Sequence, residues 1–487
     1  MTAYRIATHR FGLGPRPGDR PDADPRRWLT DQFARFAPAA PPIAAAPGST
    51  SAAERLAAFY DEQRAIREQY GPRRAAMPVP PPTTPGAPAM PDAAMPADPR
   101  QLARRAAGRD ARAIYAASVA ARANAALLSD APFVERLVHF WANHFAVSAD
   151  KLELVALSGS FEFEAIRPHV LGRFADMLSA VERHPAMLLY LDQAVSVGPA
   201  STVGQRVAAR GRRKVGLNEN LAREILELHT LGVRTGYTQG DVTELARALT
   251  GWTVPLARGP GTQGVQGPPG RFVFAPALHE PGARTILGKS YAEAGETQAQ
   301  AVLADLARHP ATARHLATKL ARHFAGDTPP PAMIARLEKA YLDSDGDLPS
   351  VYRAIVASSE AWVEQPVKFL TPWEWTIAAY RALGVRQVQP GAIVGLLNQL
   401  GQPTWKPGQP VGYDDIAASW AGPDAVMRRV EAAERFATRA AGVDARALGS
   451  ELFPAALSPA TTQAIARAES PAQATALLLV APEMLRR

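Results

Sequence analysis

The segment Gly216-Leu-Asn-Glu-Asn-Leu-Ala-Arg-Glu-Ile-Leu-Glu-Leu-His-Thr-Leu-Gly232 sets the pattern that most of the chain follows. Its apolar residues recur at helical spacing, and it ends at a glycine, which is typical of a helix C-terminus. At about 100° per residue, one side of this helix collects four polar side chains, namely Asn220, Arg223, Glu224 and Glu227. His229 falls within the opposite, apolar side. We therefore expect an amphipathic helix with a polar stripe and one inward-facing imidazole.

Similar apolar spacing covers most of the remaining chain and indicates a mainly α, large multihelical globular fold. The expected helices lie at about 25–37, 51–70, 100–128, 131–145, 161–183, 217–231, 239–250, 294–308, 310–325, 330–343, 348–359, 371–383 and 391–400. Arg271-Phe-Val-Phe is the best strand candidate, and Thr285-Ile-Leu is its expected partner. These two segments predict a small β-hairpin near 271–288.

The domain organisation follows from one change in composition. Residues from Met77 to Pro99 are rich in Pro, Ala and Met, which is typical of an extended linker. We therefore expect an N-terminal helical segment at 1–75, a linker at 76–99 and a main helical domain at 100–487. A chain of 487 residues with 47% hydrophobic and 21% charged residues can bury a large core.

Composition also excludes several classes of function. The absence of cysteine excludes disulfides, thiolate metal sites and cysteine nucleophiles. The net charge of +8 is spread along the chain, so no nucleic-acid partner is expected. No apolar run approaches the roughly 18 residues of a membrane span, and the first residues lack a secretory signal. The chain as written is therefore expected to be soluble and cytoplasmic.

A second segment, Phe133-Val-Glu-Arg-Leu-Val-His-Phe-Trp-Ala-Asn-His-Phe145, repeats the arrangement of the first. His144 falls on its apolar side, and the other side holds Glu135, Arg136, His139 and Asn143. A buried imidazole without a partner costs about 1–3 kcal/mol. His144 and His229 therefore need partners, which could be carbonyl groups, carboxylates or a metal ion.

A metal site is one reading of these histidines. His279, in His279-Glu-Pro-Gly282, would add a third imidazole from a loop. Three histidines with a carboxylate from Asp192, Asp241 or Glu227 could hold zinc or iron with an open coordination position. The alternative is that these are core histidines bonded to the backbone, because no two of them share a helix at metal-ligand spacing. The zinc-protease motif and the serine-hydrolase elbow are both absent.

Several segments resemble the bacterial domain-of-unknown-function 1800 family (DUF1800). They are Trp141-Ala-Asn-His-Phe145, His184-Pro-Ala-Met-Leu-Leu-Tyr-Leu-Asp192, 218–232, 237–252, 279–282, Ile286-Leu-Gly-Lys289 and Gly401-Gln-Pro-Thr-Trp405. The resemblance runs from about Arg10 to the C-terminus and implies a helical fold with no established activity. Relatives are often exported alongside a protein partner encoded nearby, so a periplasmic location follows if the start of this chain is mis-assigned. Relatives often carry histidine where this chain has Ala142.

The resemblance favours a buried polar network over a solvated stripe. The expected members of this network are Asn143, Asp192, Asn218, Glu219, Asn220, Glu244, Arg247 and Trp252. Beside it we consider an enzyme-like pocket where the helix 217–231, the helix 131–145 and the loop at His279 meet. In that pocket the metal ligands are His144, His229 and His279, and the catalytic candidates are Arg223, Glu224, Glu227 and Asp241. The alternative is a helical scaffold or partner-binding protein whose polar groups are structural.

Overall fold

The computed structural model describes residues 2–19, 23–46, 51–70, 98–210, 216–255, 264–440, 442–454 and 456–487. Within these residues the fold is mainly helical, which confirms the expected mainly α class. The expected linker at 76–99 lies almost wholly outside the described residues, so the division into three parts stays a prediction. No described helix is both long enough and apolar enough to cross a membrane.

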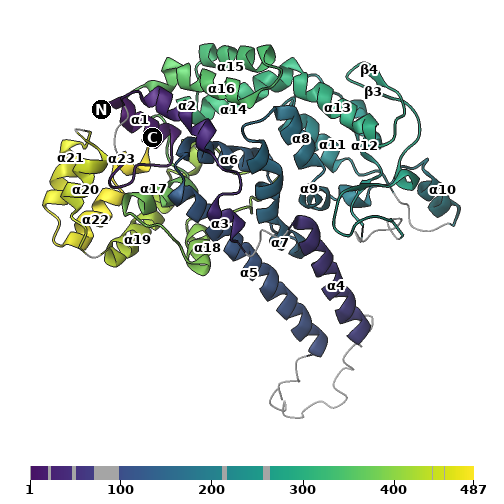
Figure 1. Ribbon diagram of the computed structural model, residues 1–487, viewed down its shortest axis with the longest axis horizontal. Coiled ribbons are helices and arrows are strands. Elements are labelled where there is room, and N and C mark those ends of the chain that lie inside the picture. Colours follow the sequence, from purple (N-terminus) through teal and green to yellow (C-terminus); the bar gives the residue numbers. More distant parts are fainter. Residues whose placement is uncertain are drawn as a thin grey trace, which may run out of the picture.

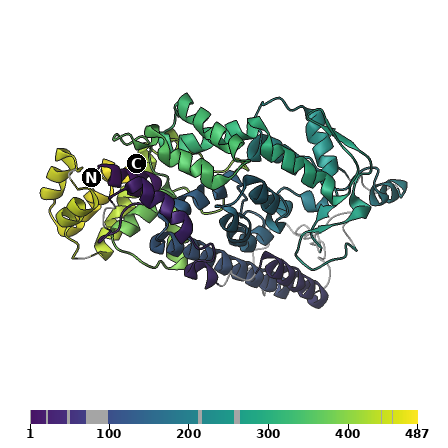
Figure 2. The same ribbon diagram turned by 45° about the horizontal axis from the view of Figure 1, so that its top comes forward.

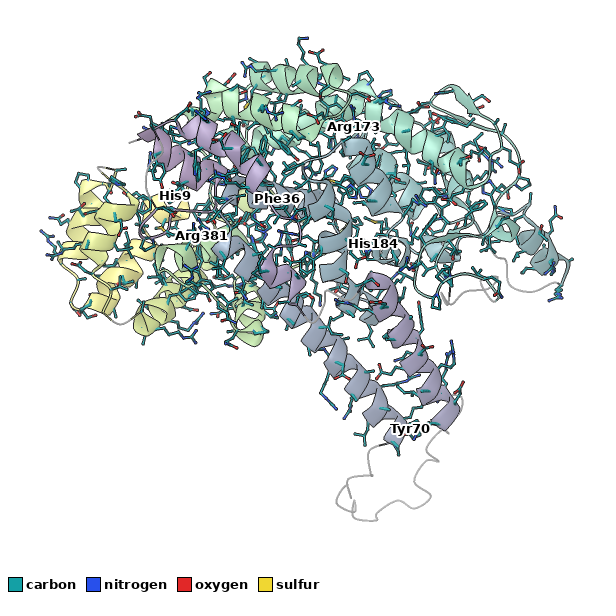
Figure 3. The ribbon with its side chains drawn as sticks, in the orientation of Figure 1. His9, Phe36, Tyr70, Arg173, His184 and Arg381 are labelled. Atoms are coloured by element: carbon teal, nitrogen blue, oxygen red, sulfur yellow. The ribbon has the colours of Figure 1, made fainter. Side chains whose placement is uncertain are left out.

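The first half of the chain runs through the body from α1 to α12 and forms a projecting pair of helices (Figure 1). The pair consists of α4 (Ala52–Tyr70) and α5 (Pro99–Leu128), which lie side by side with Tyr70 at the far end (Figure 3). The other helices of this half are α1 (Thr2–Ile6), α2 (Pro25–Arg35), α3 (Pro41–Ala44), α6 (Pro132–His144), α7 (Leu152–Phe161), α8 (Phe174–Glu182), α9 (Pro185–Tyr190), α10 (Thr202–Ala209), α11 (Asn220–Glu224) and α12 (Gln239–Leu249).

The second half packs as two groups of helices, of which the C-terminal one (yellow) lies at the left end in Figure 2 and the other runs along the top of the body. The first group is α13 (Glu296–Arg308), α14 (Pro310–Ala325), α15 (Pro331–Asp343) and α16 (Leu348–Ala357). The second group is α17 (Pro372–Ala382), α18 (Pro390–Gln399), α19 (Pro423–Arg439), α20 (Ala445–Leu452), α21 (Pro459–Ala466), α22 (Pro471–Leu479) and α23 (Pro482–Leu485). The last five of these helices lie in a stretch for which the sequence predicted no elements.

Two large hydrophobic cores follow from this arrangement. The larger core contains the apolar side of α6 together with α8, α12, α13, α14 and α16. The smaller core joins α5 to α17, α18, α19 and α22. The N-terminal segment packs into both cores, with Ile6 and Phe11 in the larger core and Leu13 in the smaller one. Arg381 of α17, labelled in Figure 3, donates hydrogen bonds to the carbonyl oxygens of Gly14 and Ala126.

The expected strands exist, but they do not pair with each other. β1 (Trp252–Thr253) pairs antiparallel with β2 (Val273–Phe274), and β3 (Arg284–Ile286) pairs with β4 (Lys289–Tyr291). Leu287 and Gly288 have φ values of 51° and 76°, the left-handed conformation of a two-residue hairpin turn. Because this turn folds β3 directly onto the residues that follow it, β2 pairs instead with the segment after α12.

The single helix expected at 161–183 is broken in the structure. A π-helical turn at Glu162–Ile166 and a 3-10 turn at Arg167–His169 precede α8. Pro168 has no backbone N–H, so the α-helical ladder cannot continue through this position. The helix expected at 217–231 begins as α11 and then widens into a π-helical turn at Ile225–His229. Its polar stripe is therefore not that of an ideal α-helix.

Candidate functional site

A cavity of about 220 Å³ lies against the polar side of α6. Its wall is formed by Arg122 of α5, by α6 and the residues just after it, by the C-terminal half of α14, by the start of α17 and by the loop at 402–415. The cavity is therefore built from five parts of the chain, most of which are far apart in sequence. Its chemistry depends on which of the charged side chains in this wall already have partners.

The loop at 402–415 is held to α6 by Asn143. The Asn143 amide nitrogen donates to the Tyr413 carbonyl oxygen, and its amide oxygen accepts from the Tyr413 N–H, both at 2.8 Å. Gly412 has a φ of 82°, and a Cβ there would collide with the Asn143 backbone. Glycine is thus required where the loop passes over α6.

Glu374 is a buried wall carboxylate with two cationic partners. It pairs with Arg136 of α6 and lies 3.0 Å from the guanidinium of Arg487. Burial opposes its ionisation, but the charges of Arg487 and Arg136 prevail and lower the pKa of Glu374 to about 2. Glu374 also closes the capping box of α17 with Thr371. The negative charge of Glu374 is therefore already compensated by Arg136 and Arg487.

Asp415 is the second buried carboxylate of the wall. Its oxygens lie 2.9 Å from His323 Nδ1 and 3.0 Å from Lys368 Nζ. Burial would raise its pKa, but the hydrogen bond from His323 and the charge of Lys368 hold the pKa of Asp415 well below its ordinary value. Burial lowers the pKa of His323 to about 4, so this imidazole is neutral and donates to Asp415 through Nδ1–H.

Lys319 and Arg322 are the two cations of the wall that lack a carboxylate partner. They are three residues apart on α14 and both line the cavity. No Asp or Glu of the described residues lies within 4.0 Å of either one. Burial, only partly offset by the charge of Asp415, lowers the pKa of Lys319 to about 8. The Arg322 Nε is buried without a hydrogen-bond partner among the described residues.

His144 connects Lys319 to the interior of the larger core. Lys319 Nζ lies 2.9 Å from His144 Nδ1, and His144 Nε2 lies 3.2 Å from the His229 carbonyl oxygen. Burial and then the charge of Lys319 lower the pKa of His144 well below its ordinary value. His144 is thus neutral, with Nε2–H donating to the carbonyl and Nδ1 accepting from Lys319. The His229 Nδ1 in turn lies 2.7 Å from a Glu182 carboxylate oxygen.

The three histidines considered as metal ligands do not share one site. His144 and His229 are neighbours, with ring centroids 6.3 Å apart, but both nitrogens of His144 are occupied by protein partners. His279 lies beside Thr250, with its Nδ1 2.8 Å from the Thr250 carbonyl oxygen. In the part of the chain that the structure describes, no group of three or more His, Asp or Glu side chains could hold a metal ion. The residues present therefore do not fit zinc or iron.

The catalytic candidates on α11 and the following turn lie half-buried outside the cavity wall. Arg223 lies 3.3 Å from Glu227 and donates to Gln239 at 2.9 Å. Burial raises the pKa of Glu224. Asp241 caps α12 together with Thr238 and accepts from the Leu287 N–H. The hydrogen bonds to Asp241 outweigh burial and lower its pKa. Arg223 and Glu227 thus form an ion pair, and Asp241 caps a helix.

The residues expected to form one buried network are divided among separate neighbourhoods. Glu219 accepts from Gln239 and Thr243, and Asn220 is exposed. Asn218 donates to the carbonyl oxygens of 191 and 192, and the Asp192 carboxylate binds Lys151. Glu244 pairs with Arg247 and Arg284. Trp252 is fully buried in the larger core. Of this set, only Asn143 lines the cavity.

Sequence reasoning missed Lys319, Arg322 and the two wall carboxylates. Lys319, Arg322 and His323 form a polar stripe on α14 at spacings of three and four residues, which also describes an ordinary solvent face. Two family-like segments did point here. Three residues of Trp141-Ala-Asn-His-Phe145 and four residues of Gly401-Gln-Pro-Thr-Trp405 line the cavity.

Comparison with known proteins yields one match. The family model described as "Protein of unknown function (DUF1800)" matches residues 6–486. No curated protein and no solved structure matches the chain. The matched range includes every part of the cavity wall.

Proposed function

Because the chain belongs to the domain-of-unknown-function 1800 family, whose description assigns no activity, we propose its function from the cavity: it binds a small anionic molecule. Lys319 and Arg322 would hold the negative charge of this ligand. The observation that carries the proposal is that these two wall cations lack a carboxylate partner among the described residues.

The argument rests on the cost of an unpaired charge. Enclosing a cation away from water without a counter-ion is unfavourable, and proteins usually pair such a group or let it lose its charge. The other arginines of the wall follow this rule, since Arg122 pairs with Glu162 and Arg136 pairs with Glu374. A ligand carboxylate or oxyanion would supply the missing partner for Lys319 and Arg322.

The size and lining of the cavity restrict the ligand further. A volume of about 220 Å³ accommodates a small molecule. Trp373, Trp405 and Tyr413 give part of the wall an aromatic surface. This proposal keeps the pocket expected from the sequence but moves it to the cavity beside α6. It includes no metal, because both nitrogens of His144 are occupied by protein partners.

Calorimetric titration with acetate, pyruvate, phosphate and sulfate tests the proposal. We expect at least one of these anions to bind, and Lys319→Met or Arg322→Met to weaken its binding at least tenfold. Arg314→Met is the matched control, because it removes a charge from the same helix at a side chain that is 67% exposed and paired with Glu338. Binding that is unchanged in both cavity variants, or absent for all four anions, would contradict the proposal.

A purely structural role for the polar groups is the second candidate, and the buried pair of His229 with Glu182 favours it. Their side chains are 1% and 0% exposed. We expect His229→Ala to lower the free energy of unfolding by about 3 kcal/mol, because it leaves a buried carboxylate unpaired. Glu227→Gln should change it by less than about 1 kcal/mol, because that ion pair is partly solvated. Urea denaturation measures the free energy of unfolding of both variants. Equal losses in the two variants would argue against a structural role for the buried pair of His229 with Glu182.

A further inference from the structure

Lys319 differs from every other lysine that the structure describes. The other five have a carboxylate oxygen within 3.3 Å of Nζ, at 2.5 Å for Lys151 and Lys289, 2.7 Å for Lys339, 3.0 Å for Lys368 and 3.3 Å for Lys406. Lys319 has a neutral imidazole instead, at 2.9 Å. Its amine faces a cavity and lacks the anionic partner that would keep it protonated.

We infer that Lys319 is a nucleophilic amine that forms an imine with a small oxo acid bound in the cavity. The inference rests on the proposed anion site and names its substrate class. A carboxylate next to a carbonyl group fits the two cations of α14, because Arg322 would hold the carboxylate while the carbonyl carbon meets Lys319 Nζ. Burial lowers the pKa of Lys319 to about 8, which increases the neutral share of the amine at physiological pH.

The reaction balances without any oxidant or further reactant. The lone pair of Nζ attacks the carbonyl carbon, and the electrons of the C=O double bond move to oxygen. A proton passes from nitrogen to this oxygen to give a carbinolamine. The nitrogen lone pair then expels the hydroxyl group, which takes up a proton and leaves as water. The resulting iminium loses its remaining N–H proton, which replaces the proton that the hydroxyl group consumed. The products are one imine and one water molecule.

His144 is suited to carry the protons of this reaction. Its Nδ1 lies 2.9 Å from Lys319 Nζ, and its Nε2–H is bound to the His229 carbonyl oxygen at 3.2 Å. This second hydrogen bond fixes the tautomer that leaves Nδ1 as an acceptor. His144 can therefore take a proton from the attacking nitrogen and return it to the departing hydroxyl group.

The test is reductive trapping with glyoxylate and sodium cyanoborohydride on the full-length protein, followed by peptide mass spectrometry. We expect one carboxymethyl group on Lys319 in preference to the other lysines. Lys319→Arg should abolish this adduct, and Lys339→Arg, the matched control at an exposed ion pair, should leave it unchanged. His144→Gln should slow the labelling of Lys319 at least tenfold.

A second aldehyde separates carboxylate recognition from amine reactivity and keeps the test valid if Lys319→Arg does not fold. Propanal has no carboxylate, so we expect Arg322→Met to slow labelling by glyoxylate at least tenfold more than it slows labelling by propanal. Glycolate carries the carboxylate of glyoxylate but has no aldehyde, so its binding by calorimetry reports on the anion site alone. If labelling is spread evenly over the lysines while glycolate still binds, the imine is overturned and the anion site is kept. Even labelling with no glycolate binding would overturn both.

Discussion

The charged form of Lys319 lowers the stability of the folded protein. In the charged form, the burial that lowers its pKa to about 8 opposes folding by about 3 kcal/mol at neutral pH. The hydrogen bond that Lys319 donates to His144 stabilises the folded state by only about 1 kcal/mol. A residue that is unfavourable for stability and enclosed in a cavity wall is typical of a binding site.

We therefore expect Lys319→Met to stabilise the ligand-free protein by about 1–2 kcal/mol, because Met fills a similar volume without a charge. Urea denaturation measures the change. The control is Arg314→Met on the same helix, which should change the free energy of unfolding by less than about 0.5 kcal/mol. A clear loss of stability in Lys319→Met would mean that Lys319 is structural.

Buried neutral histidines predict how stability depends on pH. Burial lowers the pKa of His9 to about 3 and that of His315 to about 4, below the unfolded value of about 6.5. The unfolded chain therefore binds protons first as the pH falls. Stability is fully present above about pH 6.5 and is lost toward pH 4, by about 1.4 kcal/mol per pH unit for each such histidine.

Urea denaturation between pH 7.5 and 4.5 checks this dependence. His315→Gln should make the loss of stability less steep, because one proton-binding group of the unfolded chain is removed. Equal stability at pH 7.5 and 5, or an unchanged slope in the variant, would contradict the assignment of a neutral His315.

At the scale of elements, the loop at 402–415 decides whether the cavity is closed. It has little regular structure, and the two hydrogen bonds of Asn143 attach it to α6. Loops gain order mainly from such contacts, since they lack the ladder of a helix or a sheet. Asn143 therefore secures the loop at Tyr413, while Trp405 is held by Glu162 and Asp415 by His323 and Lys368.

We expect Asn143→Leu to lower the free energy of unfolding by about 2 kcal/mol, because the polar backbone groups of Tyr413 lose their partners. Hydrogen exchange at 402–415 should become at least tenfold faster. Asn398→Leu is the control, because Asn398 is exposed on α18, so its removal should affect neither measurement. Unchanged exchange in Asn143→Leu would show that other contacts hold the loop.

Some elements that the sequence analysis left unassigned carried recognisable signals. Ser458-Pro459 and Ser470-Pro471 each pair an N-cap serine with a proline in the first turn, and both begin helices. The break at Pro168 could be predicted from the missing N–H in the same way. The strand pairing could not, because pairing depends on which segments tertiary packing brings together.

At the scale of the whole molecule, buried ion pairs join the two cores across the cavity. Arg136 belongs to the helix that fills the larger core, Glu374 to a helix of the smaller core, and Arg487 lies between them. Glu374 thus compensates two buried cations at once. The cost of removing it falls on both halves of the body.

We expect Glu374→Gln to lower the free energy of unfolding by about 3–5 kcal/mol, because Arg136 and Arg487 would stay buried without their carboxylate. Glu338→Gln is the control, because it breaks an ion pair with the exposed Arg314 and should cost less than about 1 kcal/mol. Calorimetric unfolding of both variants checks the prediction. A small effect in Glu374→Gln would mean that the two cores do not depend on this contact.

The sequence by itself determined the helical class, most helix positions and the inward direction of His144 and His229, because these follow from local spacing along the chain. Only the tertiary structure decided which polar stripe faces a cavity. The stripe of α6 and the stripe of α11 look alike in sequence, yet the first is enclosed by Glu374, Asp415 and Lys319 from distant segments, while the second stays partly solvated. Desolvation depends on neighbours in space, and it separates a reactive lysine from an ordinary one.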